Sequence, residues 1–136
     1  MIKVGDTFEH KVSYSQEQVN TFAEISGDKN PIHIDPEFAK TTPFGRPIVH
    51  GIFSASVFSK VFGMLFPGPG TIYMGQNLKF TGPVFIGEEY IAKFVVTKVR
   101  TDKHMGFVDC TLESKEGKVV IVGDAVMKHA IQFVEK

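Results

Sequence analysis

The chain contains little of several features that mark whole classes of protein. Its only cysteine, Cys110, excludes an internal disulfide and predicts a reducing compartment. Fifteen basic residues balance fifteen acidic ones, so no basic excess points to nucleic acid or to an acidic membrane surface. No apolar run approaches the ~20 residues of a membrane-spanning helix, and residues 1–6 lack the apolar core of a signal peptide. We therefore expect a cytoplasmic protein with no nucleic-acid or membrane partner.

What is present describes one ordinary folded domain. The 136 residues are 43% hydrophobic and 22% charged, and they contain no internal repeat or linker. Residues 1–136 are therefore predicted to form a single domain. The thirteen phenylalanines are expected to fill its core rather than to hold a cofactor.

Helix signals stand in the first half of the chain. Ser15 and Gln18 have the spacing of a capping box, and Gly27 is placed to end the helix that follows. Asp35-Pro36 combines an N-cap with a proline at the first helical position, which predicts a short helix over residues 37–40.

The remaining pattern predicts a sheet around one helix. Residues 52–65 are apolar on nearly every side, which is typical of a buried helix. Apolar residues alternate with polar ones along most of the second half, and short turns between such segments favour antiparallel pairing. The predicted strands cover residues 7–14, 72–80, 90–100, 106–113 and 118–130. We therefore predict an α+β fold in which a curled antiparallel sheet wraps around one long helix. Cys110 is expected to be a buried strand residue on the face of Val108 and Leu112.

Asp28 and His33 are the residues that suggest chemistry. The segment between them, Lys29-Asn30-Pro31-Ile32, is a poor helix sequence, because proline has no N–H and pushes Asn30 toward extended geometry. We expect an ordered loop that turns back and aims both side chains at one point. A carboxylate and an imidazole aimed at one water molecule can remove a proton from it and deliver a proton elsewhere. This is the chemistry of adding or removing water.

The same residues resemble a known motif. Residues 22–39 resemble, without departure, the hydratase-2 motif of the MaoC-like (R)-specific enoyl-CoA hydratases, through Phe22, Ile25, Ser26, Gly27, Asp28, Asn30, Pro31, Ile32, His33 and Ala39. The resemblance continues through residues 44–51, 75–80 and 83–88, and so covers nearly the whole chain.

This resemblance implies a hotdog fold and a homodimer with the acyl tunnel near its interface. It also implies a reversible reaction, the syn addition of water to a trans-2-enoyl-CoA to give a (R)-3-hydroxyacyl-CoA. No cofactor is implied, because coenzyme A is part of the substrate.

Further residues complete the expected site. Gly51 stands at the start of the central helix, where backbone N–H groups lack partners and the dipole is positive, so its N–H is expected to stabilise the thioester oxygen. By resemblance, Ser59 is a candidate polar group near the thioester or pantetheine, with Ser54 and Ser56 as weaker candidates. Phe58 and Phe62 are candidates for the acyl pocket, where their rings would favour short chains.

Each of these residues also has a structural interpretation. Asp28 can cap a turn, and His33 can be a packed histidine bonded to backbone. Asn30 is expected chiefly to shape the loop, with substrate contact as a second role. His50 can brace the Asp28 loop, touch substrate or simply pack. Ser59 can bond to the preceding turn of its helix. These acids and histidines follow no known metal-site spacing, so no metal is predicted.

Competing functions remain open at this point. The same chemistry can run as dehydration on an acyl carrier protein, which is acidic and would favour a basic rim formed by Arg46, Lys60 and Lys79. A hotdog thioesterase would place a carboxylate on or near the central helix, and residues 52–65 contain none. A non-catalytic acyl-binding subunit would have no need of both Asp28 and His33.

Overall fold

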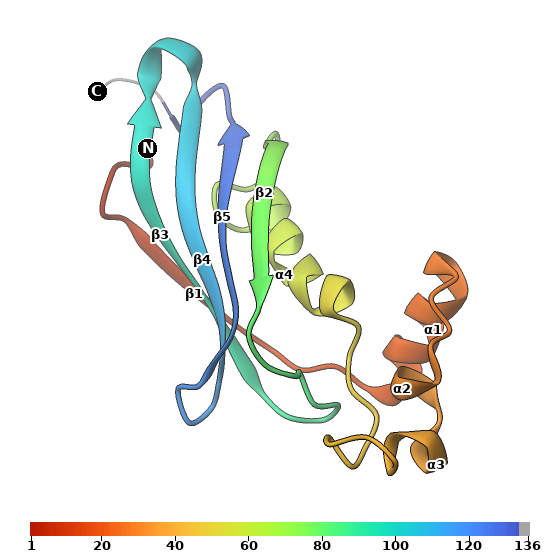
Figure 1. Cartoon of the computed structure of the whole chain (residues 1–136). Coiled ribbons are helices and arrows are strands. Elements are labelled where there is room, and N and C mark those ends of the chain that lie inside the picture. Colours follow the sequence, from red (N-terminus) through yellow and green to blue (C-terminus); the bar gives the residue numbers. More distant parts are fainter. Residues whose placement is uncertain (134–136) are drawn as a thin grey trace.

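The computed structural model describes residues 1–133 and shows a long curled sheet with one helix against its inner face (Figure 1). The helices and strands are, in chain order, β1 Thr7–Val12, α1 Gln16–Ser26, α2 Pro31–Ile34, α3 Pro36–Ala39, α4 Gly51–Met64, β2 Ile72–Phe80, β3 Tyr90–Arg100, a single 3₁₀ turn Thr101–Lys103, β4 Met105–Ser114 and β5 Val119–Lys128. Helices α1, α2 and α3 gather beyond the sheet and connect to α4 through residues 40–50 (Figure 1).

The sheet has five strands in the order β1-β3-β4-β5-β2, and every neighbouring pair is antiparallel. The register shifts between Tyr73 and Gly75 in β2 and between Val96 and Lys98 in β3. Such bulges bend a strand and increase its twist, which helps the sheet to curl over α4. The predicted α+β fold is confirmed.

The core lies between α4 and the concave face of the sheet. Phe58 and Phe62 have no exposed surface, and their rings meet the ring of Phe94 edge-on, with centroids 5.7 Å and 5.3 Å away. Cys110 is buried between Val108 and Leu112 on the inner face of β4, as predicted. Burial raises the pKa of the Cys110 thiol to about 11, so this cysteine is a packing residue.

The prediction that the central helix is buried on all sides is wrong for a single chain. One face of α4 packs on the sheet, but Ile52 is 63% exposed and Met64 is 64% exposed on the opposite face. Ser56, Ser59 and Lys60 are exposed with them. The sheet curls far enough to cover only one side of the helix. Within residues 1–133, no helix combines the length and the apolar character needed to cross a membrane.

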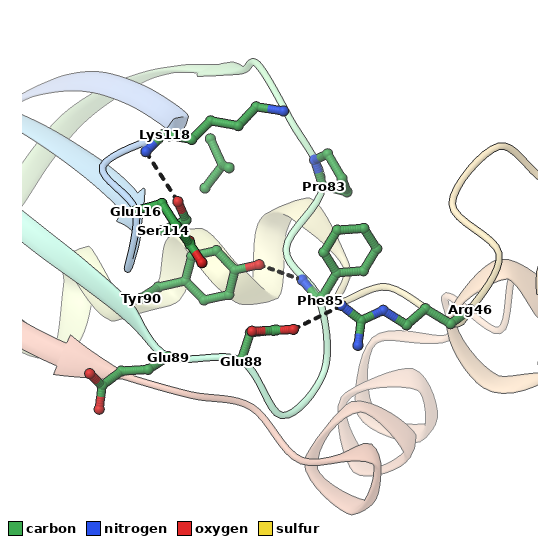
Figure 2. Close-up of a pocket in the computed structure, with 10 residues that line it drawn as sticks. Arg46, Pro83, Phe85, Glu88, Glu89, Tyr90, Ser114, Glu116 and Lys118 are labelled. Carbon is green, nitrogen blue, oxygen red and sulfur yellow. Dashed lines mark hydrogen bonds and ion pairs between the residues drawn. The ribbon is translucent and has the colours of Figure 1, made fainter.

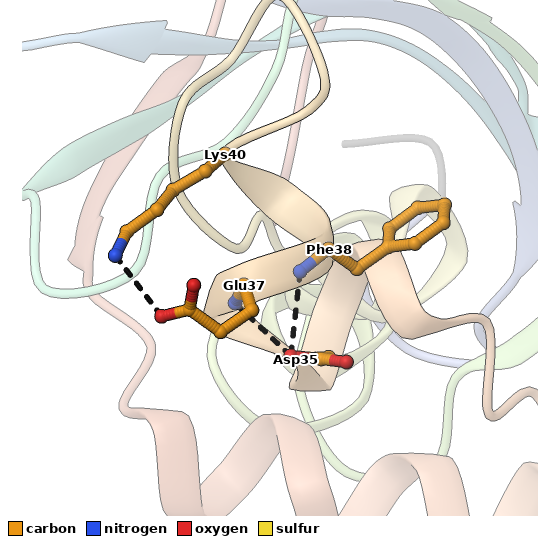
Figure 3. Close-up of polar contacts among 4 residues, drawn as sticks. All are labelled: Asp35, Glu37, Phe38 and Lys40. Atoms are coloured by element: carbon orange, nitrogen blue, oxygen red, sulfur yellow. Dashed lines mark hydrogen bonds and ion pairs between the residues drawn. The ribbon is translucent and has the colours of Figure 1, made fainter.

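Two local predictions about the first half are confirmed. Ser15 and Gln18 form the predicted capping box of α1, and Gly27 ends that helix in the left-handed conformation with φ of 81°. Asp35 caps α3, accepting hydrogen bonds from the backbone N–H groups of Glu37 and Phe38 at 3.0 Å and 3.3 Å (Figure 3).

The segment before His33 is not a simple loop. Residues 31–34 form the short helix α2, with Asn30 as N-cap and Pro31 at the first helical position. Proline is favoured there because the first N–H of a helix needs no intrahelical partner. Pro31 therefore begins a helix here, and the prediction of a loop over this segment is wrong because proline breaks a helix only at later positions.

The alternation predicted for β2 also fails at one end. The inserted residue at the Tyr73/Gly75 bulge changes which side chains face inward. Tyr73 therefore packs against Phe62, with ring centroids 5.4 Å apart, whereas Ile72 is 62% exposed.

Candidate active site

Asp28 is presented by a turn that begins where α1 ends. The backbone N–H of Asn30 donates to Oδ1 of Asp28 at 3.2 Å, and the N–H of Ile32 donates to Oδ1 of Asn30 at 3.2 Å. Each side chain thus closes a turn two residues ahead of itself. The Asp28 side chain stays exposed while the chain turns into α2. Asn30 shapes the turn, as expected from the sequence.

His33 is held by a backbone group from another part of the chain. Its Nδ1 lies 2.8 Å from the carbonyl oxygen of Ile48. Because a carbonyl can only accept, Nδ1 carries the hydrogen and the lone pair of the neutral ring is on Nε2. The side chain is 8% exposed. Ile48 could not be predicted from the sequence, because nothing in its side chain signals that its backbone oxygen orients a histidine.

Burial keeps the His33 ring in its neutral form. The pKa of His33 lies below the ordinary value for histidine, and desolvation is the main cause. The Ile48 carbonyl and the Asp28 carboxylate raise this pKa, whereas His50 lowers it further. The net downward direction leaves a basic Nε2 near neutral pH.

The fold brings Asp28, His33 and His50 together. Each offers one oxygen or nitrogen atom, and these three atoms lie within 4.8 Å of one another. The rings of His33 and His50 are stacked with centroids 3.9 Å apart and an interplanar angle of 28°. Residues five and twenty-two positions apart in the chain therefore form one polar cluster.

The cluster is a poor metal site despite this proximity. Nε2 of His50 lies 2.9 Å from the backbone oxygen of Asp28, which can only accept, so Nε2 is engaged as a donor. The other ring nitrogen, Nδ1, is enclosed by protein atoms. Three-ligand binding would require this ring to turn and the bond to Asp28 to break. We assign no metal to the cluster.

A cleft of about 490 Å³ opens beside His33. His33, Gly51 and Ser54 supply its polar end, and the remaining wall is mostly apolar, formed by Phe44, Ile48, Val49, Phe80, Thr81, Gly82, Pro83, Val84 and Ile121. Gly51 is the first residue of α4, so its N–H has no intrahelical acceptor. The cleft therefore combines an apolar wall, a basic nitrogen and a helix N-terminus.

Of the serines and phenylalanines proposed for the site from the sequence, only Ser54 lines the cleft. Ser59 is exposed on the outer face of α4, two turns from Gly51 and outside the cleft wall. Ser54, ranked lower from the sequence, lines the cleft and donates to the carbonyl oxygen of Gly51 at 2.7 Å. Phe58 and Phe62 lie in the hydrophobic core and are not part of the cleft wall. Their role in an acyl pocket stays a prediction, as does the role of Ser59.

Phe44 and Phe80 were not foreseen as cleft residues. They come from the loop before α4 and from the end of β2, and no local pattern links two such distant positions. Gly51 shows the closeness of the packing, because a β-carbon at that position would lie 3.0 Å from the Phe80 ring.

Comparison with known proteins finds a matching family and similar enzymes. Residues 2–118 match the MaoC like domain family. The chain is 42% identical over 127 residues to an (R)-specific enoyl-CoA hydratase of Aeromonas caviae, covering 93% of this chain and 95% of that protein. It is 40% identical over 127 residues to a 3-hydroxybutyryl-CoA dehydratase of Methylorubrum extorquens, covering 93% and 80%.

The fold also matches that of a solved hydratase structure. The (R)-hydratase from A. caviae involved in PHA biosynthesis superposes with a TM-score of 0.91 at 41% identity, covering 94% of this chain and 97% of that one. The relatives named for their reaction are hydratases or dehydratases, so the chain has the expected fold and enzyme class. Together, the family match and these identities show that the chain belongs to the family of MaoC-like hotdog hydratases and dehydratases.

Proposed function

We propose that this protein is a (R)-specific enoyl-CoA hydratase that reversibly adds water to trans-2-enoyl-CoA in the syn sense. The observation that carries the proposal is the proximity of Asp28 to His33, with one ligand atom of each within 4.8 Å of the other, where His33 and Gly51 line one end of an apolar cleft. The names of the relatives support the same chemistry.

The geometry suggests how one water molecule is held. In the resting state the Asp28 carboxylate and the neutral Nε2 of His33 are both acceptors, so one water can donate a hydrogen to each. Its lone pairs then face the alkene carbon C3. A base beside the water raises its nucleophilicity.

The proposed reaction moves one proton through His33. The water oxygen bonds to C3 while Nε2 takes a proton from the water, and the electron pair of the double bond moves toward the thioester. The same proton then passes from Nε2 to C2. The hydroxyl group and the hydrogen are added to the same face of the alkene because His33 and the water lie on that face. No cofactor is consumed.

Gly51 is proposed to stabilise the charge that forms on the thioester oxygen. Its N–H stands at the positive end of α4 and within the cleft wall. Fixed donors aimed at a developing negative charge are among the largest contributions to catalysis. The absence of a side chain lets the thioester approach the backbone.

Free coenzyme A is the preferred carrier in this proposal. A second pocket of about 270 Å³ shares Pro83 with the cleft, and Glu88, Glu89 and Glu116 line it (Figure 2). Arg46 is already paired with Glu88 at 3.0 Å and lies over the Phe85 ring, 4.1 Å from its centroid. Coenzyme A and an acidic carrier protein both bring negative charge to this pocket, and the support for coenzyme A is that the two relatives described above are named for CoA thioesters.

A homodimer is also proposed. Strand β2 is an edge of the sheet, paired on one side with β5 only. Met74 on β2 is 50% exposed, and Ile52 and Met64 are exposed on the neighbouring α4. A second copy would cover this apolar face. We also propose the cytoplasm as its location, because the only cysteine is a thiol without a partner cysteine.

The direct test follows crotonyl-CoA by loss of the enoyl-thioester absorbance, with chiral analysis of the product. We expect loss of absorbance and (R)-3-hydroxybutyryl-CoA, with turnover falling from four-carbon to ten-carbon substrates. Rising turnover along that series would contradict the short-chain preference. Release of free thiol would instead favour a thioesterase, and reaction only on carrier-bound substrate would favour the dehydratase of fatty-acid elongation.

A further inference from the structure

His50 contacts both proposed catalytic residues, each in a different way. Its Nε2 lies 2.9 Å from the backbone oxygen of Asp28, and its ring is stacked on the ring of His33 at 3.9 Å. On another side, the Phe22 ring lies 4.8 Å from the His50 ring. The residue is 2% exposed. Its position is therefore fixed by contacts on several sides.

The bond to Asp28 constrains the residue that carries the carboxylate. Asp28 lies in an exposed turn between α1 and α2, whereas His50 precedes the long helix α4 in the interior. The Nε2–H···O=C bond connects the exposed turn to the buried residue that precedes α4. It fixes the backbone from which the Asp28 side chain projects.

The stacked ring constrains His33 in a second direction. The Ile48 carbonyl fixes one edge of the His33 ring at Nδ1, but a bond at one atom still allows the ring to tilt. Contact with the flat face of His50 opposes that tilt. Together the two contacts aim Nε2 of His33 toward the water proposed above.

A purely structural role explains His50 poorly. Among residues 1–133, its buried Nδ1 has no hydrogen-bond partner. Leaving a buried acceptor unpaired is unfavourable for folding, and an apolar ring of similar size would avoid it. His50 is also only 2% exposed and is absent from the residues that line the cleft, so it acts on the proposed site through Asp28 and His33.

We propose that His50 is a positioning residue that holds the Asp28 turn through its Nε2–H and aligns His33 through ring stacking. This inference rests on the proposed hydratase function and adds a residue to that site. It assigns a role to the buried histidine before Gly51 that the sequence left open between bracing, substrate contact and packing.

Two variants separate the hydrogen bond from the packing. His50→Phe keeps a flat ring against His33 and Phe22 but offers no donor to Asp28. His50→Gln keeps a side-chain N–H at similar reach but removes the ring. We expect kcat on crotonyl-CoA to fall about tenfold to a hundredfold in His50→Phe, with KM and Tm retained. His50→Gln should restore the part of that loss that comes from the Asp28 turn, and the missing stacked ring should keep kcat below that of the parent.

A measurement without substrate keeps the inference testable apart from the reaction. The Asn30 amide donates to the Asp28 carboxylate, so its hydrogen exchange reports the order of the turn. Exchange should accelerate in His50→Phe and stay slow in the parent and in His50→Gln. If the parent fails to hydrate any substrate, the proposed function is lost, but this exchange pattern still decides whether His50 positions Asp28.

Two results would overturn the inference. The first is parent-like kcat and Asn30 exchange in His50→Phe, which would show that the bond to Asp28 is unnecessary. The second is an equal loss of kcat in both variants together with a matching loss of Tm, which would reduce His50 to a packing residue.

Discussion

The carbonyl oxygen of Ile48 lies 2.8 Å from Nδ1 of His33 and thereby determines which nitrogen of that ring is free. A backbone oxygen cannot donate, so the hydrogen stays on Nδ1 and the lone pair on Nε2. With the His50 ring stacked on it, His33 has one defined tautomer and one defined orientation.

Replacing Asp28 by asparagine should remove the carboxylate that holds the water without disturbing the turn. The amide oxygen can still accept from the Asn30 N–H, so Tm should not change. We expect kcat/KM on crotonyl-CoA to fall roughly a hundredfold, or ~2.7 kcal/mol of barrier. Asp35→Asn is the matched control, because Asp35 also closes a turn but caps α3. Equal losses in both variants would contradict a specific role for Asp28.

The pH dependence of kcat/KM should report His33. Its protonated form cannot accept a proton from water, and its pKa lies below the ordinary value because of burial. Activity should therefore be constant above the ordinary pKa of histidine and fall only as the pH drops through the lowered value. The same shift means that His33 stabilises the fold above its unfolded pKa, and this contribution is lost on acidification.

A second histidine provides the control for that profile. Burial and Lys60 also lower the pKa of His10, but His10 lies on β1, outside the cleft. His10→Gln should leave the acid limb of the profile unchanged. If that limb moves in His10→Gln, it cannot be assigned to His33.

Gly51→Ala should impair catalysis more than stability. The added methyl group would lie 3.0–3.2 Å from three atoms of the Phe80 ring, so the ring or the start of α4 must shift. We expect kcat to fall roughly tenfold to a hundredfold from that displacement. Gly63→Ala is the control on the same helix, since nothing lies within 4 Å of its added carbon. Alanine should stabilise a helix there by about 1 kcal/mol, which a rise in Tm would report.

Light scattering should find a dimer that depends on the outer face of α4. Met64→Glu places a charge where Met64 is 64% exposed in one chain, and burying that charge against a second copy is unfavourable. We expect a monomer with an unchanged far-UV spectrum. Val4→Glu, at a residue that is 59% exposed outside α4 and β2, should remain dimeric. A dimer in both variants would place the interface elsewhere.

The sequence by itself was enough to predict the order of helices and strands. It was also enough to single out Asp28 and His33 as candidate catalytic residues. The capping box at Ser15, the glycine stop at Gly27 and the period-two strands are local signals, and each acts within a few residues. The motif around Asp28 and His33 was equally local. For this reason the antiparallel sheet, the central helix and the proximity of Asp28 to His33 were predicted without coordinates.

Only the tertiary structure decided how those residues are oriented and what surrounds them. The Ile48 carbonyl selects the His33 tautomer, and the interior position of His50 connects it to Asp28. Phe80 reaches Gly51 from the end of β2. These contacts join positions far apart in the chain, and two of them use backbone oxygens that have no side-chain signature. The outer face of α4 was misjudged for a related reason, since the apolar residues of a helix do not tell how far the sheet of the same chain reaches around it.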